Sequence, residues 1–350
     1  LSSAILPVRS LKWHYRSRSE TLIAFSNRAF YHGELVTFPA AVRDGKDLGI
    51  GYHLVDGCFE HGKRVNQREA EYTVDLIYRH IKETPERSLG VVAFSSAQQE
   101  FIERLLAKRR RSEPDAEFFF SPERSEPFFI KNLETVQGDE RDRIIFSVAY
   151  AKDKNGKLLQ NFGPLNREGG ERRINVAVTR AKYRVELVTS VKAADIIPPR
   201  EIGGVAALRD YLAYAEQAAR NGKASEEEKT EQASTPEQAH PNTAFETNLC
   251  RFLEKKGYKT EQRVGNSRYP IDIALIDPES GNYVMAIETD GQNYRALENT
   301  SDQNRLRPAM LERMGWKHYR LWSADFLCGG ELGKARLLEA VQTALAPNDQ

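Results

Sequence analysis

The sequence predicts an α/β protein with two domains, a parallel doubly wound sheet followed by a small α/β/α unit. Its 350 residues exceed the ~250 residues that one hydrophobic core usually organises. Over the first part of the chain, short apolar runs alternate with helical patterns, which is typical of buried parallel strands with crossover helices. Residues 216–242 are polar and charged, so they predict a solvated linker. The expected domains are therefore residues 1–215 and 243–350.

The first domain shows three candidate strands and two candidate helices. An apolar run at 91–94 predicts a buried strand, and residues 96–110 follow it with helical periodicity. A second strand is expected at 143–150. A helix near 172–182 precedes a third strand at 185–189. Strands separated by helices of this length favour a parallel sheet.

The second domain predicts a compact α/β unit. Its first helix ends at Gly257, a usual C-cap residue. Trp316 and Trp322 flank an apolar strand, and we expect both in the core. The expected elements are a helix at 243–256, strands at 270–276 and 283–288, a basic helix at 302–314, a strand at 318–322 and a helix at 332–345.

Composition narrows the class of protein without identifying a partner. The 51 basic and 50 acidic side chains give a net charge of +1, so binding to nucleic acid requires local basic patches. No apolar run reaches the ~20 residues of a membrane helix, and we expect no membrane partner. Cys58, Cys250 and Cys328 lack the spacing of a zinc site, and a reducing cytoplasm is expected. The chain starts at Leu1 within patterned sequence, and we expect it to be a fragment.

Three segments of the first domain carry a motif pattern. They are LKWHYRSR at 11–18 with its continuation at 22–35, ETVQGDE at 134–140, and RINVAVTRAK at 173–182. In this order and spacing they resemble motifs IV, V and VI of superfamily 1 helicases, in particular the group that contains the nonsense-mediated decay helicase. The resemblance implies that residues 1–215 form a second RecA-like lobe, the C-terminal lobe of a helicase motor.

The resemblance places two arginines at ATP. Arg16 and Arg180 would reach the γ-phosphate, where a planar, permanently charged guanidinium stabilises the charge that develops during hydrolysis. Taken singly, each arginine also fits a surface ion pair. The sequence contains no G-x-x-x-x-G-K-[ST] loop to cradle phosphates. We therefore expect ATP to be shared with a first RecA-like lobe, and this chain alone neither to hydrolyse ATP nor to unwind a duplex.

The same resemblance assigns four residues of the 134–140 segment. Gly138 would allow close approach of the backbone to the nucleotide, and Glu140 would accept a hydrogen bond from a ribose hydroxyl. Gln137 would lie near the junction of the ATP and nucleic-acid sites. Thr135 would contact the nucleic-acid backbone.

The second domain carries three acidic residues on two neighbouring predicted strands. A hairpin brings Asp272 close to Glu288, and Asp290 shares a face with Glu288 if the strand continues. Converging carboxylates form a hard oxygen site that suits Mg²⁺ or Mn²⁺. Such a site can activate water for phosphodiester cleavage.

These carboxylates resemble the PD-(D/E)xK restriction-endonuclease-like fold, in particular its very-short-patch-repair (Vsr-like) branch. The resemblance also rests on Phe245-Glu246 and on residues 305–307, 311–316 and 320–326. It implies that Asp272 and Glu288 bind metal, with Asp290 as a third acidic residue where the wider fold usually has lysine.

The resemblance assigns further roles and also shows departures. Glu246 would support the metal site, and Arg305 and Arg307 would contact phosphates. Arg295 stands where this branch usually has histidine. Residues 302–305 read Asp-Gln-Asn-Arg where alternating arginine and aspartate are usual. A catalytically inactive, DNA-binding version of the fold is therefore an alternative.

The function expected from the sequence is an ATP-dependent DNA helicase or translocase, here without its first lobe, coupled to a metal-dependent endonuclease. Its partners would be a single-stranded DNA track, a duplex substrate and the missing lobe. An RNA-directed helicase is a further alternative. A role in DNA repair or defence against foreign DNA rests on analogy at the level of the fold.

Overall fold

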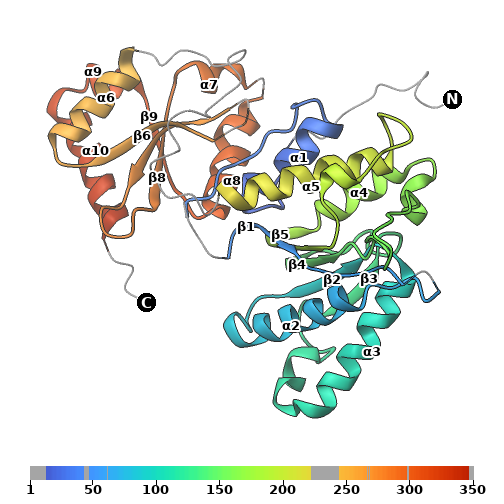
Figure 1. The fold of residues 1–350 in the computed structure, drawn as a ribbon. Coiled ribbons are helices and arrows are strands. Elements are labelled where there is room, and N and C mark those ends of the chain that lie inside the picture. The colour runs from blue at the N-terminus through green and yellow to red at the C-terminus, as the bar shows by residue number, and fades with distance from the viewer. Residues whose placement is uncertain are drawn as a thin grey trace. The chain divides into compact units, whose positions relative to one another are not determined.

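The computed structural model describes residues 13–42, 47–60, 62–221, 244–265, 267, 269–297 and 299–346. The chain forms two compact units (Figure 1). The larger unit contains residues 21–31 and 47–221, and the smaller unit contains residues 13–20, 32–42 and 244–346. No helix in the described part of the chain combines the length and apolar character that a membrane crossing needs.

The larger unit is built on a five-stranded sheet in the order β1-β5-β4-β2-β3, with every neighbouring pair parallel. This confirms the predicted parallel, doubly wound sheet, although two of its strands, β1 and β3, were not predicted. The strands are β1 (Gly49–Leu54), β2 (Leu89–Ala93), β3 (Phe129–Asn132), β4 (Arg141–Ser147) and β5 (Ala181–Thr189).

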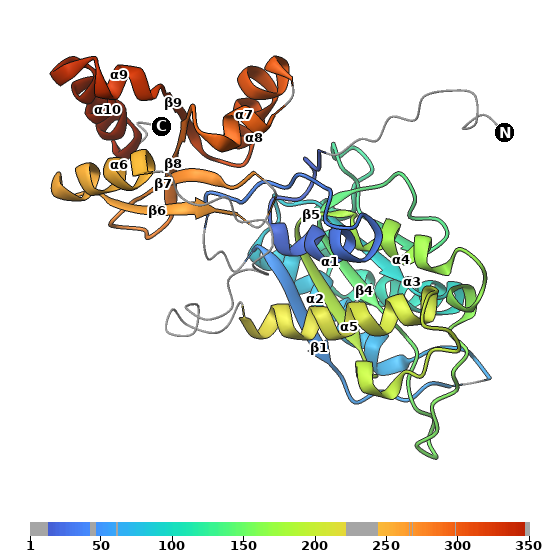
Figure 2. The same cartoon turned by 90° about the horizontal axis from the view of Figure 1, so that it is seen from above.

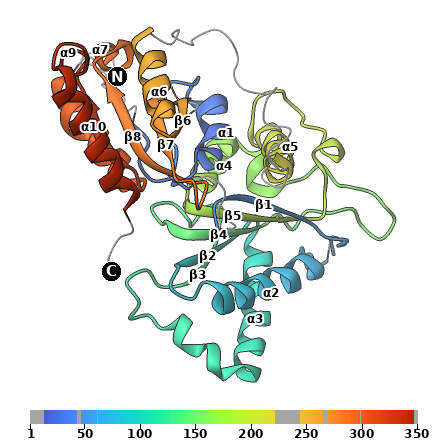
Figure 3. The same cartoon turned by 90° about the vertical axis from the view of Figure 1, so that its left-hand side faces the viewer.

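Helices cover both faces of this sheet (Figure 3). α1, α4 and α5 share a core with one face, and α2 and α3 share a core with the other. The helices are α1 (Glu20–Phe30), α2 (Gln67–Glu83), α3 (Ser96–Ser112), α4 (Gly170–Val178) and α5 (Gly204–Asn221), with short 3-10 turns η2 (Pro114–Phe120), η3 (Gly163–Asn166) and η4 (Ala193–Asp195).

Strand β4 explains the two-sided core. Ile144 and Phe146 enter the core beneath α1, α4 and α5, whereas Ile145 between them enters the core with α2 and α3. Successive side chains of a strand point to opposite faces, so a continuous apolar run fits only a strand buried on both sides.

The smaller unit contains a four-stranded mixed sheet in the order β6-β7-β8-β9 (Figure 2). β7 is antiparallel to β6 and β8, and β9 is parallel to β8. α6 and α10 pack on one face of the sheet with Ile273 and Ile287. The elements are β6 (Lys259–Val264), β7 (Ile271–Ile276), β8 (Tyr283–Thr289), β9 (Lys317–Leu321), α6 (Ala244–Lys255), α7 (Gln292–Ala296), η6 (Asp302–Leu306), α8 (Arg307–Arg313), α9 (Ser323–Leu327) and α10 (Gly330–Leu345).

Two predictions for the smaller unit need correction. The single helix expected at 302–314 is divided into a π-helical turn, η6, and the α-helix α8. Pro308 at the start of α8 has no N–H, so it cannot donate the hydrogen bond that would continue an α-helix through this point. Trp316 is buried at 2% exposure as expected, but Trp322 is 42% exposed.

The second face of the smaller sheet is covered by residues from the beginning of the chain. Val36, Phe38 and Ala41 form one buried cluster with residues of β7, β8 and α8, including Ala274 and Ala286. The compact unit is therefore larger than residues 243–350, the range expected for the second domain. Small side chains at 274 and 286 leave space over the sheet, and the earlier segment fills it.

Candidate functional site

Arg180 and the 134–140 loop meet where strands β4 and β5 of the larger sheet begin. Glu140 immediately precedes β4, Arg180 immediately precedes β5, and the two strands pair from their first residues. The Arg180 side chain donates to the Val176 carbonyl from Nε (2.7 Å) and to the Asp139 carbonyl from Nη1 (3.5 Å). Its third donor, Nη2, lies 3.1 Å from the hydroxyl oxygen of Thr179. The guanidinium is therefore ordered against the loop that the sequence assigned to the nucleotide.

The other predicted residues of this loop also lie shortly before the start of β4. Gly138 has a φ of 91°, in the left-handed region that favours glycine. Gln137 and Thr135 are exposed on either side of a buried valine. The Oε1 atom of Glu140 lies 3.9 Å from the ammonium group of Lys182.

Arg16 lies in the smaller unit, at a bend shortly after Trp13, which forms an isolated β-bridge with Val36. The Nε2 atom of His14 lies 2.9 Å from the hydroxyl of Ser17 and accepts the Ser17 backbone N–H at 3.1 Å. Arg16 lies between His14 and Ser17 in the sequence, so these contacts restrain the backbone from which its side chain extends.

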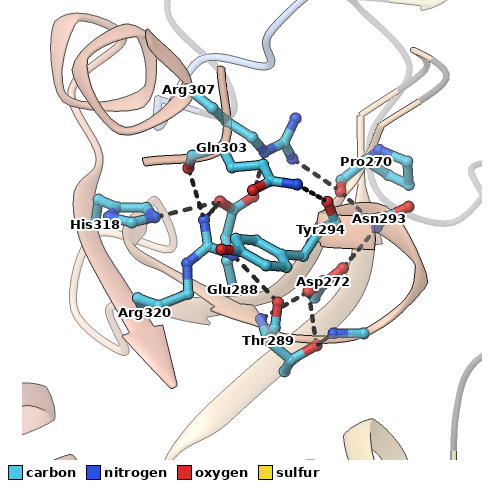
Figure 4. A network of polar contacts seen from close by, with 11 residues as sticks. Pro270, Asp272, Glu288, Thr289, Asn293, Tyr294, Gln303, Arg307, His318 and Arg320 are labelled. Carbon is cyan, nitrogen blue, oxygen red and sulfur yellow. Dashed lines mark hydrogen bonds and ion pairs between the residues drawn. The ribbon is translucent and has the colours of Figure 1, made fainter. Parts of the chain in front are cut away.

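Asp272 and Glu288 come together on neighbouring strands, as the sequence predicts. Each lies one residue beyond the paired Ile273 and Ile287 of the antiparallel strands β7 and β8. Both carboxylates are buried, with 4% and 2% exposure. Figure 4 shows them inside a continuous network of polar contacts.

Three donors surround the carboxylate of Asp272. Its Oδ2 accepts the Thr289 backbone N–H at 2.8 Å and the Thr289 hydroxyl at 3.0 Å. Its Oδ1 accepts from Nδ2 of Asn293 at 2.6 Å. Burial and the nearby charge of Glu288 raise the pKa of Asp272, and the hydrogen bonds oppose this shift.

Three positively charged or basic groups surround the carboxylate of Glu288. Arg307 Nε donates to Oε1 at 2.6 Å, while Arg320 Nη2 and His318 Nε2 lie 3.3 Å and 3.2 Å from Oε2. Burial alone raises the pKa of this carboxyl. Arg307, His318 and Arg320 outweigh burial and bring the pKa of Glu288 to about 2. Glu288 is therefore a buried anion that the protein itself neutralises.

Asp290 points to a different part of the unit. Its carboxylate accepts the Ser323 backbone N–H at 2.9 Å and the Ser323 hydroxyl at 2.8 Å, at the first residue of α9. Glu246 of α6 is buried, and its Oε1 lies 3.4 Å from the hydroxyl oxygen of Thr289. Thr289 therefore joins Glu246 to Asp272, whereas Asp290 stabilises the start of a helix.

The two arginines expected at phosphates lie in different environments. Arg305 is exposed in η6. Arg307 is only 2% exposed and donates both to Glu288 and, at 3.1 Å, to the Pro270 carbonyl. The prediction that Arg307 contacts phosphate does not describe this structure, because its guanidinium is held inside the unit.

Sequence reasoning gave no role to Thr289, Asn293, His318 or Arg320. His318 and Arg320 are two residues apart on β9, which pairs with β8, so their side chains share the face of Glu288. Alternation along residues 318–322 was the available signal. The contacts of Thr289 and Asn293 depend on the turn after β8, for which the sequence offered no comparable pattern.

The carboxylates as arranged do not fit a divalent metal ion. Within the described residues, no group of three His, Cys, Asp or Glu side chains could hold a metal. Both oxygens of Asp272 and of Glu288 already accept hydrogen bonds. A cation beside Glu288 would also be repelled by Arg307 and Arg320, by about 4 kcal/mol for each pair of unit charges 4 Å apart near a protein surface.

Comparison with known proteins gives two family matches. The AAA domain family, AAA_12, matches residues 1–192, more than half of the chain. The restriction-endonuclease family named REase_MTES_1575 matches residues 245–341.

Two curated relatives match over different lengths. The "Uncharacterized ATP-dependent helicase MG140 homolog" of Mycoplasma pneumoniae is 30% identical over 344 residues, covering 93% of this chain and 29% of the relative. The MG140 protein of Mycoplasma genitalium, also called an uncharacterized ATP-dependent helicase, is 36% identical over 226 residues, covering 60% of this chain and 19% of the relative. The chain thus spans less than a third of either relative.

Among solved structures, the C-terminal domain of a possible DNA helicase from Lactobacillus plantarum WCFS1 aligns with a TM-score of 0.31 and 16% identity, covering 53% of this chain and 90% of that chain.

Proposed function

The chain belongs to the AAA domain family, and we propose that it supplies the second lobe of an ATP-driven DNA translocase, with a nuclease-fold unit that binds DNA without cutting it. Hereafter the larger unit is the motor lobe and the smaller unit is the nuclease-fold unit. The proposal for the motor is supported by the helicase relatives and by the grouping of Arg180 with the 134–140 loop.

The chain would complete an ATP site whose phosphate-binding loop lies on another lobe. Arg180 and Arg16 would stabilise negative charge on the γ-phosphate, since oriented guanidinium groups act most strongly where charge develops. Gly138, Gln137 and Glu140 would bind the nucleotide where β4 and β5 begin, and Thr135 would contact the DNA backbone. The contact between Arg180 and the Asp139 carbonyl supports a shared role for these residues.

The observation that carries the nuclease-fold proposal is the neutralisation of Glu288. A carboxylate held by Arg307, Arg320 and His318 has little capacity left for a metal ion or for activating water. Arg295 and Arg305 are exposed, so they can meet the phosphate backbone of DNA. The unit would therefore keep the fold and DNA affinity of a nuclease while its carboxylates serve stability.

A metal-dependent DNA endonuclease is the second candidate. The adjacency of Asp272 and Glu288 and the match to a restriction-endonuclease family favour it. It requires Arg307 to leave Glu288 when DNA binds, because the present contacts exclude a cation.

One experiment distinguishes the candidates. The 350-residue chain is mixed with labelled single- and double-stranded DNA in Mg²⁺, in Mn²⁺ and in EDTA, and both binding and cutting are measured. We expect binding without cutting, with binding weakened by the double substitution Arg295→Gln and Arg305→Gln and unaffected by Asp272→Ala. Metal-dependent cutting that Asp272→Ala abolishes would overturn the non-cutting proposal. Tighter binding to single-stranded RNA than to DNA would overturn the choice of DNA.

A further inference from the structure

The segment that carries Arg16 folds as part of the nuclease-fold unit. Residues 13–20 and 32–42 belong to this unit, and α1 between them packs into the core of the motor lobe through Leu22 and Phe25. Trp13 pairs with Val36 in an isolated bridge, supported by a hydrogen bond from the His14 N–H to the Val36 carbonyl at 2.9 Å. The two parts of the segment therefore hold each other.

This segment is attached to the nuclease fold by backbone and side-chain bonds. The Ala41 N–H donates to the Met314 carbonyl at 3.2 Å, and the Tyr283 N–H donates to the Ala41 carbonyl at 2.9 Å. The indole Nε1 of Trp316 donates to the Pro39 carbonyl at 2.8 Å. Since Trp316 also stacks on Tyr283, at 5.0 Å between ring centroids, the segment is fixed on both sides of one aromatic pair.

Apolar packing reinforces these bonds. Phe38 is 2% exposed and contacts Trp13 at 5.4 Å between ring centroids. The guanidinium carbon of Arg307 lies 5.9 Å from the centroid of the Phe38 ring. The same arginine that neutralises Glu288 thus supports the segment that carries Arg16.

The residues on either side of Arg16 have their own contacts to the end of α8. The guanidinium of Arg313 lies over the Tyr15 ring at 5.7 Å, and Nη1 of Arg18 lies 3.9 Å from the sulfur of Met314. Ser17 between them is 3% exposed. The backbone around Arg16 is therefore held at both ends by the nuclease-fold unit.

From these contacts we infer that the nuclease-fold unit positions Arg16 for ATP hydrolysis by the motor, with Trp316 as a positioning residue. The inference rests on the proposed role of Arg16 at the γ-phosphate. A catalytic group must be held close to its productive geometry, and misplacement by ~1 Å costs on the order of a hundredfold in rate. Loss of the Trp316 contact should slow ATP turnover although Trp316 touches neither ATP nor DNA.

The first test uses hydrogen exchange on the 350-residue chain. The amides of Ala41 and His14 are expected to exchange in the same unfolding event as those of β8. Trp316→Ala should increase their exchange rates and leave the exchange rates of β4 and β5 unchanged. Trp316→Phe, which keeps the ring but removes the indole N–H, should have a smaller effect in the same places. Free exchange of Ala41 and His14 in a chain whose β8 stays protected would overturn the inference.

The second test measures ATP turnover in the complete helicase polypeptide, including the lobe with the phosphate-binding loop. Trp316→Phe should lower kcat several-fold and Trp316→Ala by about tenfold or more, with little change in KM, because the ATP-binding residues of the motor lobe are intact. Val341→Ala, in the core on the other side of the sheet, is the matched control and should leave kcat unchanged.

The outcomes separate this inference from the proposed function. If Arg16→Ala leaves kcat unchanged, the proposed role of Arg16 in ATP hydrolysis fails, whatever the exchange data show. If Arg16→Ala slows turnover but both Trp316 variants hydrolyse ATP at the normal rate, the positioning inference fails and the role of Arg16 stands.

Discussion

Replacing Arg307 by methionine should destabilise the nuclease-fold unit strongly. Arg307 and Glu288 are 2% exposed and joined at 2.6 Å, so the substitution leaves a buried carboxylate with only Arg320 and His318. Removing one partner of a buried ion pair typically costs about 3–5 kcal/mol of unfolding free energy. The pKa of Glu288 is lowered to about 2 in the folded chain, so its partners together outweigh the cost of burying its charge.

The loss of unfolding free energy caused by Arg307→Met should depend on pH in a predictable direction. Because the pKa of Glu288 is lowered in the folded state, its ion pairs stabilise the fold above about pH 4.5 and lose that effect as pH falls toward 2. The difference in unfolding free energy between the normal chain and Arg307→Met should therefore be largest near neutral pH and should shrink below about pH 4.5.

Urea unfolding followed by tryptophan fluorescence measures this difference directly. All three tryptophans of the chain, Trp13, Trp316 and Trp322, lie in the nuclease-fold unit, so their emission reports on that unit. Arg305→Met, at an exposed position two residues earlier, is the matched control and should change the unfolding free energy by less than about 0.5 kcal/mol. Equal urea midpoints for Arg307→Met and Arg305→Met would refute the reasoning.

Three further predictions test other parts of the molecule. Gly291→Ala should destabilise the nuclease-fold unit by about 1–3 kcal/mol in the same fluorescence assay, because the new Cβ would lie 2.9 Å from the Thr289 hydroxyl and 3.0 Å from Oε1 of Glu246. Burial raises the pKa of Glu69 to about 7 and lowers that of His80 to about 4. Protonation of Glu69 therefore increases the unfolding free energy of the motor lobe as pH falls from 7 to 4.5. Protonation of His80 in the unfolded chain decreases that free energy as pH falls from 6.5 to 4. His80→Gln should therefore turn a nearly flat pH dependence of β4 amide protection into one that rises as pH falls. Arg180→Ala should lower kcat for ATP in the complete helicase by about 10³-fold or more, and a change below tenfold would remove Arg180 from the ATP site.

Two of the three strands that the sequence predicted share one property. The runs containing Ile144, Ile145 and Phe146 in β4 and Val91 and Val92 in β2 are apolar at every position, because these strands are buried on both faces. Strand β1 begins at Gly49 and mixes buried, half-buried and exposed side chains, and the short β3 lies at the end of the strand order, beside β2. Whether these two segments form strands depends on neighbouring strands far along the chain, which the periodicity of a short sequence window does not reveal.

The candidate site also combines contacts that the sequence predicts with contacts that only the fold determines. Hairpin geometry alone placed Asp272 beside Glu288, since antiparallel strands fix which residues face each other. Whether those carboxylates meet a metal or an arginine depends on helix α8, which returns to the strands after 19 residues and inserts Arg307. The resemblance to the restriction-endonuclease-like fold implied that Arg307 contacts phosphate, but only the fold determines that its guanidinium faces inward.

The contacts of Arg307 give its ion pair with Glu288 a structural role that needs no nuclease chemistry. Arg307 contacts Glu288 on one side and the Phe38 ring on the other, and Phe38 packs against Trp13 in the segment that carries Arg16. A buried ion pair contributes little net stability compared with apolar residues of the same volume, but removing one member of it is costly. Loss of either member would therefore also disturb the surface on which the Arg16 segment packs. The carboxylate of Glu288 and its partner Arg307 therefore help to support the segment that carries Arg16, the arginine that we propose acts at ATP.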